Sequence, residues 1–186
     1  MARTKYGYAE SSDIKATNAG HIYNIVNESG AIENGTLWTK GDVAFTQDEE
    51  VYKVTAPTKG GKVILALSSL YSYDTSTTLG QHEMYLRKEA GEVARGYELV
   101  EGDRYAIADY MVTTLAGSGK PAVAKNLLVA DTSKNTYTEV AAATEVDDYG
   151  FVARINSIVY RSNLTLYNIE VIKNIDVPAD TGGVGG

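Results

Sequence analysis

A period-two pattern of side chains is clearest in the second half of the chain. Over residues 92–99, Val93, Arg95, Tyr97 and Leu99 occupy one phase, and the intervening residues occupy the other. Alternation of this kind is typical of a β-strand whose two faces meet different surroundings. The pattern therefore predicts a strand here.

Other short segments rich in valine, isoleucine and tyrosine predict further strands, because these side chains fit a pleated, half-buried surface. The predicted strands are residues 21–26, 43–45, 51–54, 63–67, 105–112, 127–130, 137–140, 151–160 and 164–175. Glycine and asparagine tolerate positive φ, so Asn34-Gly35 predicts a hairpin-type turn. Turns are also predicted at Lys40-Gly41-Asp42 and Gly102-Asp103, and a hairpin connection at 131–135. Residues 81–90 are compatible with two turns of helix or with a strand.

These elements predict an all-β protein, either an antiparallel β-sandwich or a barrel-like fold with short hairpins. We expect an extended N-terminal arm and lead-in over residues 1–20, because no clear period appears there. A single β-rich domain is predicted for residues 21–177. The glycine-rich residues 178–186 predict a flexible C-terminal tail.

Composition adds a prediction about surfaces. The 186-residue chain has 14 tyrosines but only 2 phenylalanines and 1 tryptophan. Tyrosine combines an apolar ring with a hydroxyl that tolerates water, and it is enriched in protein interfaces. Fourteen tyrosines are more than the core of a protein of this size can bury with their hydroxyls hydrogen-bonded. We therefore expect several of them at contacts with other subunits.

Charge and residue usage exclude several kinds of chemistry. The formal net charge is −7, so the basic footprint of a nucleic-acid-binding protein is missing. The sequence has no cysteine, which removes disulfides, thiolate metal sites and cysteine nucleophiles. No apolar run approaches the 18 or more residues expected of a membrane helix. We therefore expect neither nucleic acid nor membrane as a partner.

Motifs for phosphate and zinc binding are incomplete. Gly117-Ser118-Gly119-Lys120 resembles part of a phosphate-binding loop, but the lysine is followed by Pro121 instead of serine or threonine. His82-Glu83 begins like a zinc-protease helix, but the second histidine would have to stand where Leu86 is. His21 is the only other histidine.

Calcium and carboxylate sites are also poorly supported. Asp131, Ser133 and Asn135 have the spacing of a calcium loop, but Thr136 replaces the required glycine, and a hairpin turn explains them better. The acidic runs at 48–50 and 147–148 are typical of solvated loops. We therefore predict no catalytic residue, no metal site and no cofactor.

The first residues form a candidate partner-contact segment. Arg3 and Lys5 lie on one phase of an extended chain, and Tyr6 and Tyr8 lie on the other. A strip with one basic and one aromatic face could order on a partner, at a cost of roughly 1–2 kcal/mol per residue. We therefore expect an arm that is disordered in the free protein and ordered when bound. An arm without any partner fits the same residues.

The order of several segments resembles capsid decoration (cement) and related head proteins of tailed bacteriophages. The resemblance extends over roughly residues 20–175. The segments that carry it are residues 34–37, 50–54 with Pro57, 90–99, 101–105 and 171–174.

The resemblance implies a non-enzymatic virion protein that binds the outside of an assembled phage head and stabilises it. Its partner would be the shell of the major capsid protein, and it would be a homo-oligomer. Its location would be the capsid surface, and the host cytoplasm during assembly. The alternative is a carbohydrate- or receptor-binding β module of a phage fibre or tail, with Trp38 as the one indole available for stacking on a sugar.

Overall fold

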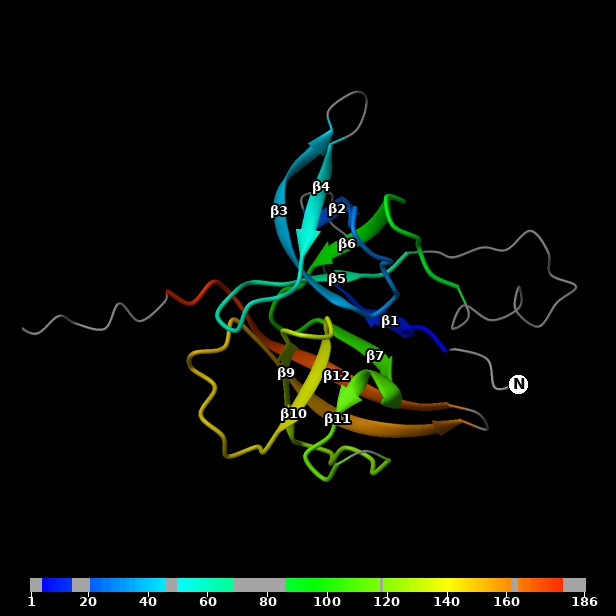
Figure 1. The fold of residues 1–186 in the computed structure, drawn as a ribbon. Coiled ribbons are helices and arrows are strands. Elements are labelled where there is room, and N and C mark those ends of the chain that lie inside the picture. The colour runs from blue at the N-terminus through cyan, green and yellow to red at the C-terminus, as the bar shows by residue number, and fades with distance from the viewer. Residues whose placement is uncertain are drawn as a thin grey trace, which may run out of the picture.

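A seven-stranded sheet and a smaller closed barrel make up the computed structural model of the protein (Figure 1). The structure describes residues 5–14, 21–45, 50–68, 86–117, 119–161 and 164–178. The prediction of an all-β fold is confirmed. A short 3-10 helix, η4 (Asp109–Met111), interrupts the strands after β7.

The larger sheet has the spatial order β1-β7-β12-β11-β9-β10-β8. Its strands are β1 (Ala9–Asp13), β7 (Arg104–Ala108), β8 (Val112–Thr113), β9 (Leu127–Asp131), β10 (Thr136–Val140), β11 (Phe151–Arg161) and β12 (Leu164–Asn174). Neighbouring strands are antiparallel except β10 and β8, which are parallel.

The barrel closes in the order β2-β4-β3-β5-β6, with β6 returning to β2. Its strands are β2 (Ile22–Val26), β3 (Leu37–Phe45), β4 (Val51–Thr55), β5 (Ile64–Ala66) and β6 (Ala94–Glu98). The pair β2–β4 is parallel, and the other pairs are antiparallel. Both sheets therefore have mixed strand orientation.

Strands β11 and β12 form the longest hairpin and confirm the two final predicted strands. They pair from Phe151 with Asn174 to Arg161 with Leu164. The first half of β11 is mostly buried, whereas its last residues are exposed or half-buried. The hairpin therefore begins in the core and projects beyond it (Figure 1).

The turn predicted at Lys40-Gly41-Asp42 is wrong. These residues lie inside β3, where the register against β4 shifts between Lys40 and Val43. A Cβ on Gly41 would lie 3.1 Å from the carbonyl oxygen of Lys53, so glycine permits the close approach of β4. A shift of this kind bends a strand. The bend lets β3 pair with β5 at its start and with β4 farther along.

The chain turns at Asn34-Gly35 as predicted, but this turn does not join two paired strands of a hairpin. Gly35 has φ of +82°. The turn leads into β3, but β3 does not pair with the preceding strand β2. The strand predicted for 105–112 also ends early, because the chain enters η4 at Asp109.

Half of the 81–90 segment, residues 81–85, lies outside the described residues. Within the described part, Lys88 forms an isolated antiparallel bridge with Ile32. The predicted tail also lies outside the described residues except for Pro178.

One hydrophobic core joins the sheet to the barrel. Leu37, Val63 and Leu65 of the barrel side are fully buried in the same cluster as Ile107 and Phe151 of the sheet. A smaller cluster fills the barrel itself, and it consists of Ile25, Ile32, Trp38, Val54, Ala66 and Ala94. The shared core fixes the two layers against each other.

Polar side chains bridge the same junction. The hairpin turn predicted at 131–135 is confirmed, and its last residue reaches the barrel, where Asn135 Nδ2 donates to the carbonyl of Leu37 (3.1 Å). The buried amide of Asn174 accepts from the N–H of Val63 (2.8 Å) and donates to the carbonyls of Val63 (2.9 Å) and Leu99 (2.8 Å). These bonds satisfy backbone groups that burial would otherwise leave unpaired.

Candidate interaction surface

The N-terminal segment is docked on the sheet. Strand β1 pairs antiparallel with β7, from Ala9 with Ile107 to Asp13 with Arg104. Before the strand, the carbonyl of Tyr8 accepts the N–H of Ala108 (3.1 Å). The prediction that this arm, residues 1–12, is disordered in the free protein is therefore wrong for residues 5–12, because the segment already pairs with β7 and with Glu33 of the same chain.

Glycine at position 7 permits this docking. Gly7 is buried, and a Cβ there would lie 2.5 Å from the carbonyl oxygen of Asn34. Its N–H donates to Glu33 Oε2 (2.6 Å), which ties the segment to the approach to β3. The sequence pattern carried no signal for this contact, because it joins residues far apart in the chain.

Three of the four predicted partner-contact residues can be placed. Lys5 is exposed, with its ammonium 5.7 Å from the ring centroid of Tyr110. Tyr6 is half-buried, with its ring 4.6 Å from the Arg87 guanidinium. Tyr8 is half-buried, and its hydroxyl donates to Glu10 Oε1 (2.8 Å). Arg3, the fourth, lies outside the described residues.

Tyr110 holds the segment through a hydrogen bond as well as through its ring. The hydroxyl of Tyr110, in η4, donates to the carbonyl of Tyr6 (2.8 Å). The N–H of Tyr8 points to the sulfur of the adjacent Met111 at 3.3 Å. Lys5 and Tyr6 therefore form a continuous surface with η4, a surface that sequence reasoning missed because it assigned no role to η4.

A hollow of about 650 Å³ opens next to this surface. It lies between η4, the loop after β8 and the outer end of the β11–β12 hairpin. Its lining residues are Asp109, Tyr110, Val112, Thr113, Thr114, Gly117, Gly119, Lys120, Pro121, Lys134, Tyr160, Thr165 and Tyr167. Volumes of this order are common for binding sites.

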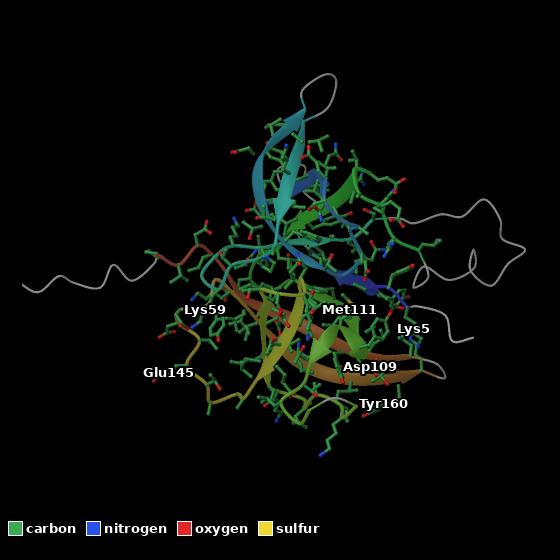
Figure 2. All side chains as sticks on the ribbon, viewed as in Figure 1. Lys5, Lys59, Asp109, Met111, Glu145 and Tyr160 are labelled. Carbon is green, nitrogen blue, oxygen red and sulfur yellow. The ribbon has the colours of Figure 1, made fainter. Side chains whose placement is uncertain are left out.

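Two exposed tyrosines flank the hollow. Tyr160 has 72% of its surface exposed and Tyr110 has 41%, whereas Tyr167 is buried and accepts the N–H of Ala122 on its hydroxyl (2.9 Å). Figure 2 shows Lys5, Asp109 and Tyr160 at one end of the molecule, with Lys59 and Glu145 at the other. We call this end, defined by Lys5, Tyr6, Asp109, Tyr110 and Tyr160, the tyrosine surface.

The described tyrosines divide into buried, half-buried and exposed ones. Tyr105, Tyr137 and Tyr167 are buried. The tyrosines that remain partly or largely exposed are Tyr6, Tyr8, Tyr23, Tyr52, Tyr97, Tyr110, Tyr149 and Tyr160. The other three, Tyr71, Tyr73 and Tyr85, lie outside the described residues. Tyr110 and Tyr160 are the exposed ones among the described tyrosines, and contact with other subunits stays a prediction.

A second aromatic cluster lies on the barrel and is satisfied internally. The Lys40 ammonium lies 4.1 Å from the Tyr23 ring centroid and 4.5 Å from that of Tyr52. The Tyr23 hydroxyl donates to Glu98 Oε2 (2.8 Å), and this bond, together with burial and the carboxylate charge, raises the pKa of Tyr23 to about 12. Lys62 also pairs with Glu98. Lys40, Lys62 and Glu98 therefore all have partners within the cluster, and these contacts stabilise the wall of the barrel.

Two of the carboxylates considered for chemistry make structural contacts. Asp131 Oδ1 accepts the N–H of Ser133 (2.9 Å) and the hydroxyl of the same residue (2.7 Å), as a turn requires. Asp148 pairs with Lys59. Among the described residues, no group of three histidine or carboxylate side chains is arranged to hold a metal ion. His82 lies outside them, and Nδ1 of His21 lies 3.9 Å from Glu98 Oε1.

A buried carboxylate shapes the loop that borders the hollow. Glu139 is almost fully buried and accepts the N–H groups of Leu115 (3.0 Å) and Val123 (2.8 Å) and the amide of Asn126 (2.7 Å). Three donors compensate the buried charge. The Glu139 side chain therefore holds together the loop over residues 114–126. This loop forms one wall of the hollow.

Comparison with protein-family models, with curated proteins and with solved structures finds no significant match. Within the described ranges, no helix has the length and apolar character needed to cross a membrane.

Proposed function

We propose that the protein is a non-enzymatic structural protein of a virus particle, a capsid decoration protein that binds the outside of an assembled phage head. The observation that supports the proposal is the tyrosine surface, where exposed phenols border an open hollow at the end of the seven-stranded sheet. Tyrosine rings supply large contact area at low entropy cost, as interfaces require. The segment-level resemblance to decoration proteins names the partner, the shell of the major capsid protein.

The docked N-terminal segment changes the proposed mode of binding. Lys5 and Tyr6 are already held against Tyr110 and Arg87, so they present a formed surface to the shell. Less ordering entropy is then lost on binding than with a free arm. A protein that binds only the assembled shell stabilises it by mass action, by about 2.7 kcal/mol per site at a free concentration 100 times the Kd.

Purified particles test the proposal. Virus particles from the producing culture would be separated on a density gradient, and the protein quantified by mass spectrometry against the major capsid protein. We expect stoichiometric amounts on filled heads and surface labelling by antibody in electron microscopy. Absence from heads, or labelling confined to tails, would overturn the assignment.

Variants then locate the contact. Replacing Tyr110 and Tyr160 together by serine should weaken binding to undecorated heads at least tenfold, since exposed aromatic anchors dominate interfaces. Ile175→Ser is the matched control, because Ile175 is also exposed (54%) but follows the other end of β12. Equal loss in both variants would contradict a role for the tyrosine surface.

The carbohydrate-binding alternative is supported by the same hollow and not by Trp38. The indole of Trp38 is only 7% exposed and donates to Thr36 Oγ1 (2.7 Å), so it offers no platform for a sugar. Tyr110 and Tyr160 would stack on sugar rings, and the Asp109 carboxylate would accept hydrogen bonds from sugar hydroxyls. Specific binding to a glycan array, lost in the tyrosine double variant, would favour this function if heads do not bind.

A further inference from the structure

The two terminal strands of the seven-stranded sheet have features that discourage pairing with another chain. β8 has only two residues. β1 has only five residues and a register shift between Ser11 and Asp13. Short edges, charges and bulges are the usual means by which native sheets block edge-to-edge association.

A third edge within the sheet lacks this protection. β11 pairs along its length with β12, but on its other side β9 covers only Val152–Arg154. The last bonds on that side join Ile155 to Asn126 and Lys125. Within the part of the chain that the structure describes, no strand pairs with residues 157–161 on that side, where the hairpin projects (Figure 1).

The backbone groups of this edge point outward at alternate residues. Two residues connect Arg161 to Leu164, and such a short connection makes those residues a hydrogen-bonded pair. Hydrogen-bonded and non-hydrogen-bonded pairs then alternate back along the hairpin. The N–H and C=O groups of Ile158 and Tyr160 are thereby directed away from β12.

The side chains along the edge present little charge. Residues 157–160 are uncharged, and Tyr160 is 72% exposed. Arg161 at the outer end is paired with Glu10 (2.7 and 3.0 Å), and Arg154 at the inner end is paired with Glu170 (3.1 Å). The arginines that would repel a second copy are neutralised within their own chain.

We propose that a second copy of this chain pairs antiparallel with this edge about a two-fold axis at Val159, and that the two sheets become continuous. In this register Ile158 lies opposite Tyr160 of the partner subunit, with about four new backbone hydrogen bonds. An aromatic ring beside a β-branched side chain is a favourable cross-strand pair. Ser157 lies opposite Arg161 of the partner subunit, so no two like charges face each other. The contact is self-complementary, as a two-fold interface must be.

Sedimentation equilibrium of the purified full chain tests the proposal without any capsid, so its outcome is separate from that of the proposed function. We expect a reversible monomer–dimer equilibrium. In the dimer, Tyr160→Asp places one negative charge from each subunit next to the two-fold axis. The repulsion between them should raise the dimer Kd at least tenfold. Because Tyr160 is exposed, the melting temperature of the monomer should change little. Ile175→Asp adds the same charge at a distant exposed site and should leave the dimer Kd unchanged.

A charge pair tests the register. Ser157→Glu and Ser157→Lys both replace the hydroxyl that accepts from Asn168 Nδ2 (3.0 Å), and they place charges of opposite sign at this position. Opposite Arg161 of the partner subunit, Ser157→Glu should dimerise at least about threefold more tightly than Ser157→Lys, and salt should reduce the difference.

Hydrogen exchange locates the contact directly. Raising the protein concentration should slow exchange at the amides of Ile158 and Tyr160. A monomer at all concentrations up to about 1 mM, a dimer unaffected by Tyr160→Asp, equal Kd values for the two position-157 variants, or new protection confined to β1 would each overturn the proposal.

Discussion

Replacing Tyr137 by phenylalanine removes a single hydroxyl from the junction between sheet and barrel. The Tyr137 hydroxyl donates to the carbonyl of Gly35 (3.0 Å) and lies 3.1 Å from the hydroxyl of Tyr105. Because its one proton goes to Gly35, the Tyr105 hydroxyl is the donor of the second bond. Burial raises the pKa of both phenols, so both remain protonated at neutral pH.

Because Tyr105 donates to Tyr137 and Tyr137 donates to Gly35, removing either hydroxyl should lower the free energy of unfolding by a different amount. Tyr137→Phe leaves both the Tyr105 hydroxyl and the Gly35 carbonyl without a partner, which predicts a loss of about 2–4 kcal/mol in the free energy of unfolding. Tyr105→Phe removes one donor and keeps the bond to Gly35, which predicts about 0.5–1.5 kcal/mol. In the double variant the orphaned hydroxyl is gone, so it should be about 1 kcal/mol more stable than Tyr137→Phe alone.

Urea unfolding of the four proteins measures these differences. The fluorescence of Trp38, the single indole, reports on the barrel, and far-ultraviolet circular dichroism reports on both sheets. The two probes should give coincident transitions with an unchanged m value, since the junction belongs to a shared core. The reasoning is refuted if Tyr137→Phe costs less than about 0.5 kcal/mol, if Tyr105→Phe costs more than Tyr137→Phe, or if the two losses add.

Three further outcomes follow from the described contacts. Gly7→Ala forces a methyl group to within 2.5 Å of a backbone carbonyl, so it should lower stability by about 1–3 kcal/mol in thermal or urea unfolding; an unchanged melting temperature would mean that the N-terminal segment is not docked in solution. Glu139→Ala deprives three donors of their acceptor and should cost about 3 kcal/mol or more, with faster amide exchange over residues 114–126, whereas Glu139→Gln should recover part of the loss. Hydrogen bonds from Asn156 and from two arginines lower the pKa of Glu170 to about 2 from its ordinary 4.5. This carboxylate therefore contributes stability above pH 4.5 that is lost as the pH falls towards 2, and Glu170→Gln should flatten that part of the stability profile measured by urea unfolding.

The all-β character and several strands could be predicted from sequence because they depend on local patterns. The 92–99 alternation predicted β6, and the apolar runs after 150 predicted β11 and β12. The hairpin at 131–135 was equally local, since Asp131 accepts hydrogen bonds from residues two and three positions ahead. Steric and hydrogen-bonding preferences of neighbouring residues suffice for such elements.

The dipeptide Gly-Asp occurs at 41–42 and at 102–103, and its structure at each place depends on whether another strand packs against it. Gly102-Asp103 is the predicted turn between β6 and β7, with Gly102 at φ of +88°. Gly41-Asp42 lies within β3 as a bulge, because β4 approaches Gly41 at the carbonyl of Lys53. The sequence predicted a turn at both, since nothing local to residues 40–42 reveals that a strand packs there.

The candidate surface was also decided by tertiary structure. Lys5, Tyr6 and Tyr8 stood out from composition and phase, but their docking depends on β7, η4 and Glu33, which lie far away in the chain. Lone exposed side chains such as Tyr160 leave no pattern by which sequence could single them out. Sequence alone determined several of the strands and a surplus of tyrosine, because these follow from each residue and its neighbours. Only the folded chain decided which tyrosines reach the surface, because that depends on long-range pairing between β1 and β7 and within the β11–β12 hairpin.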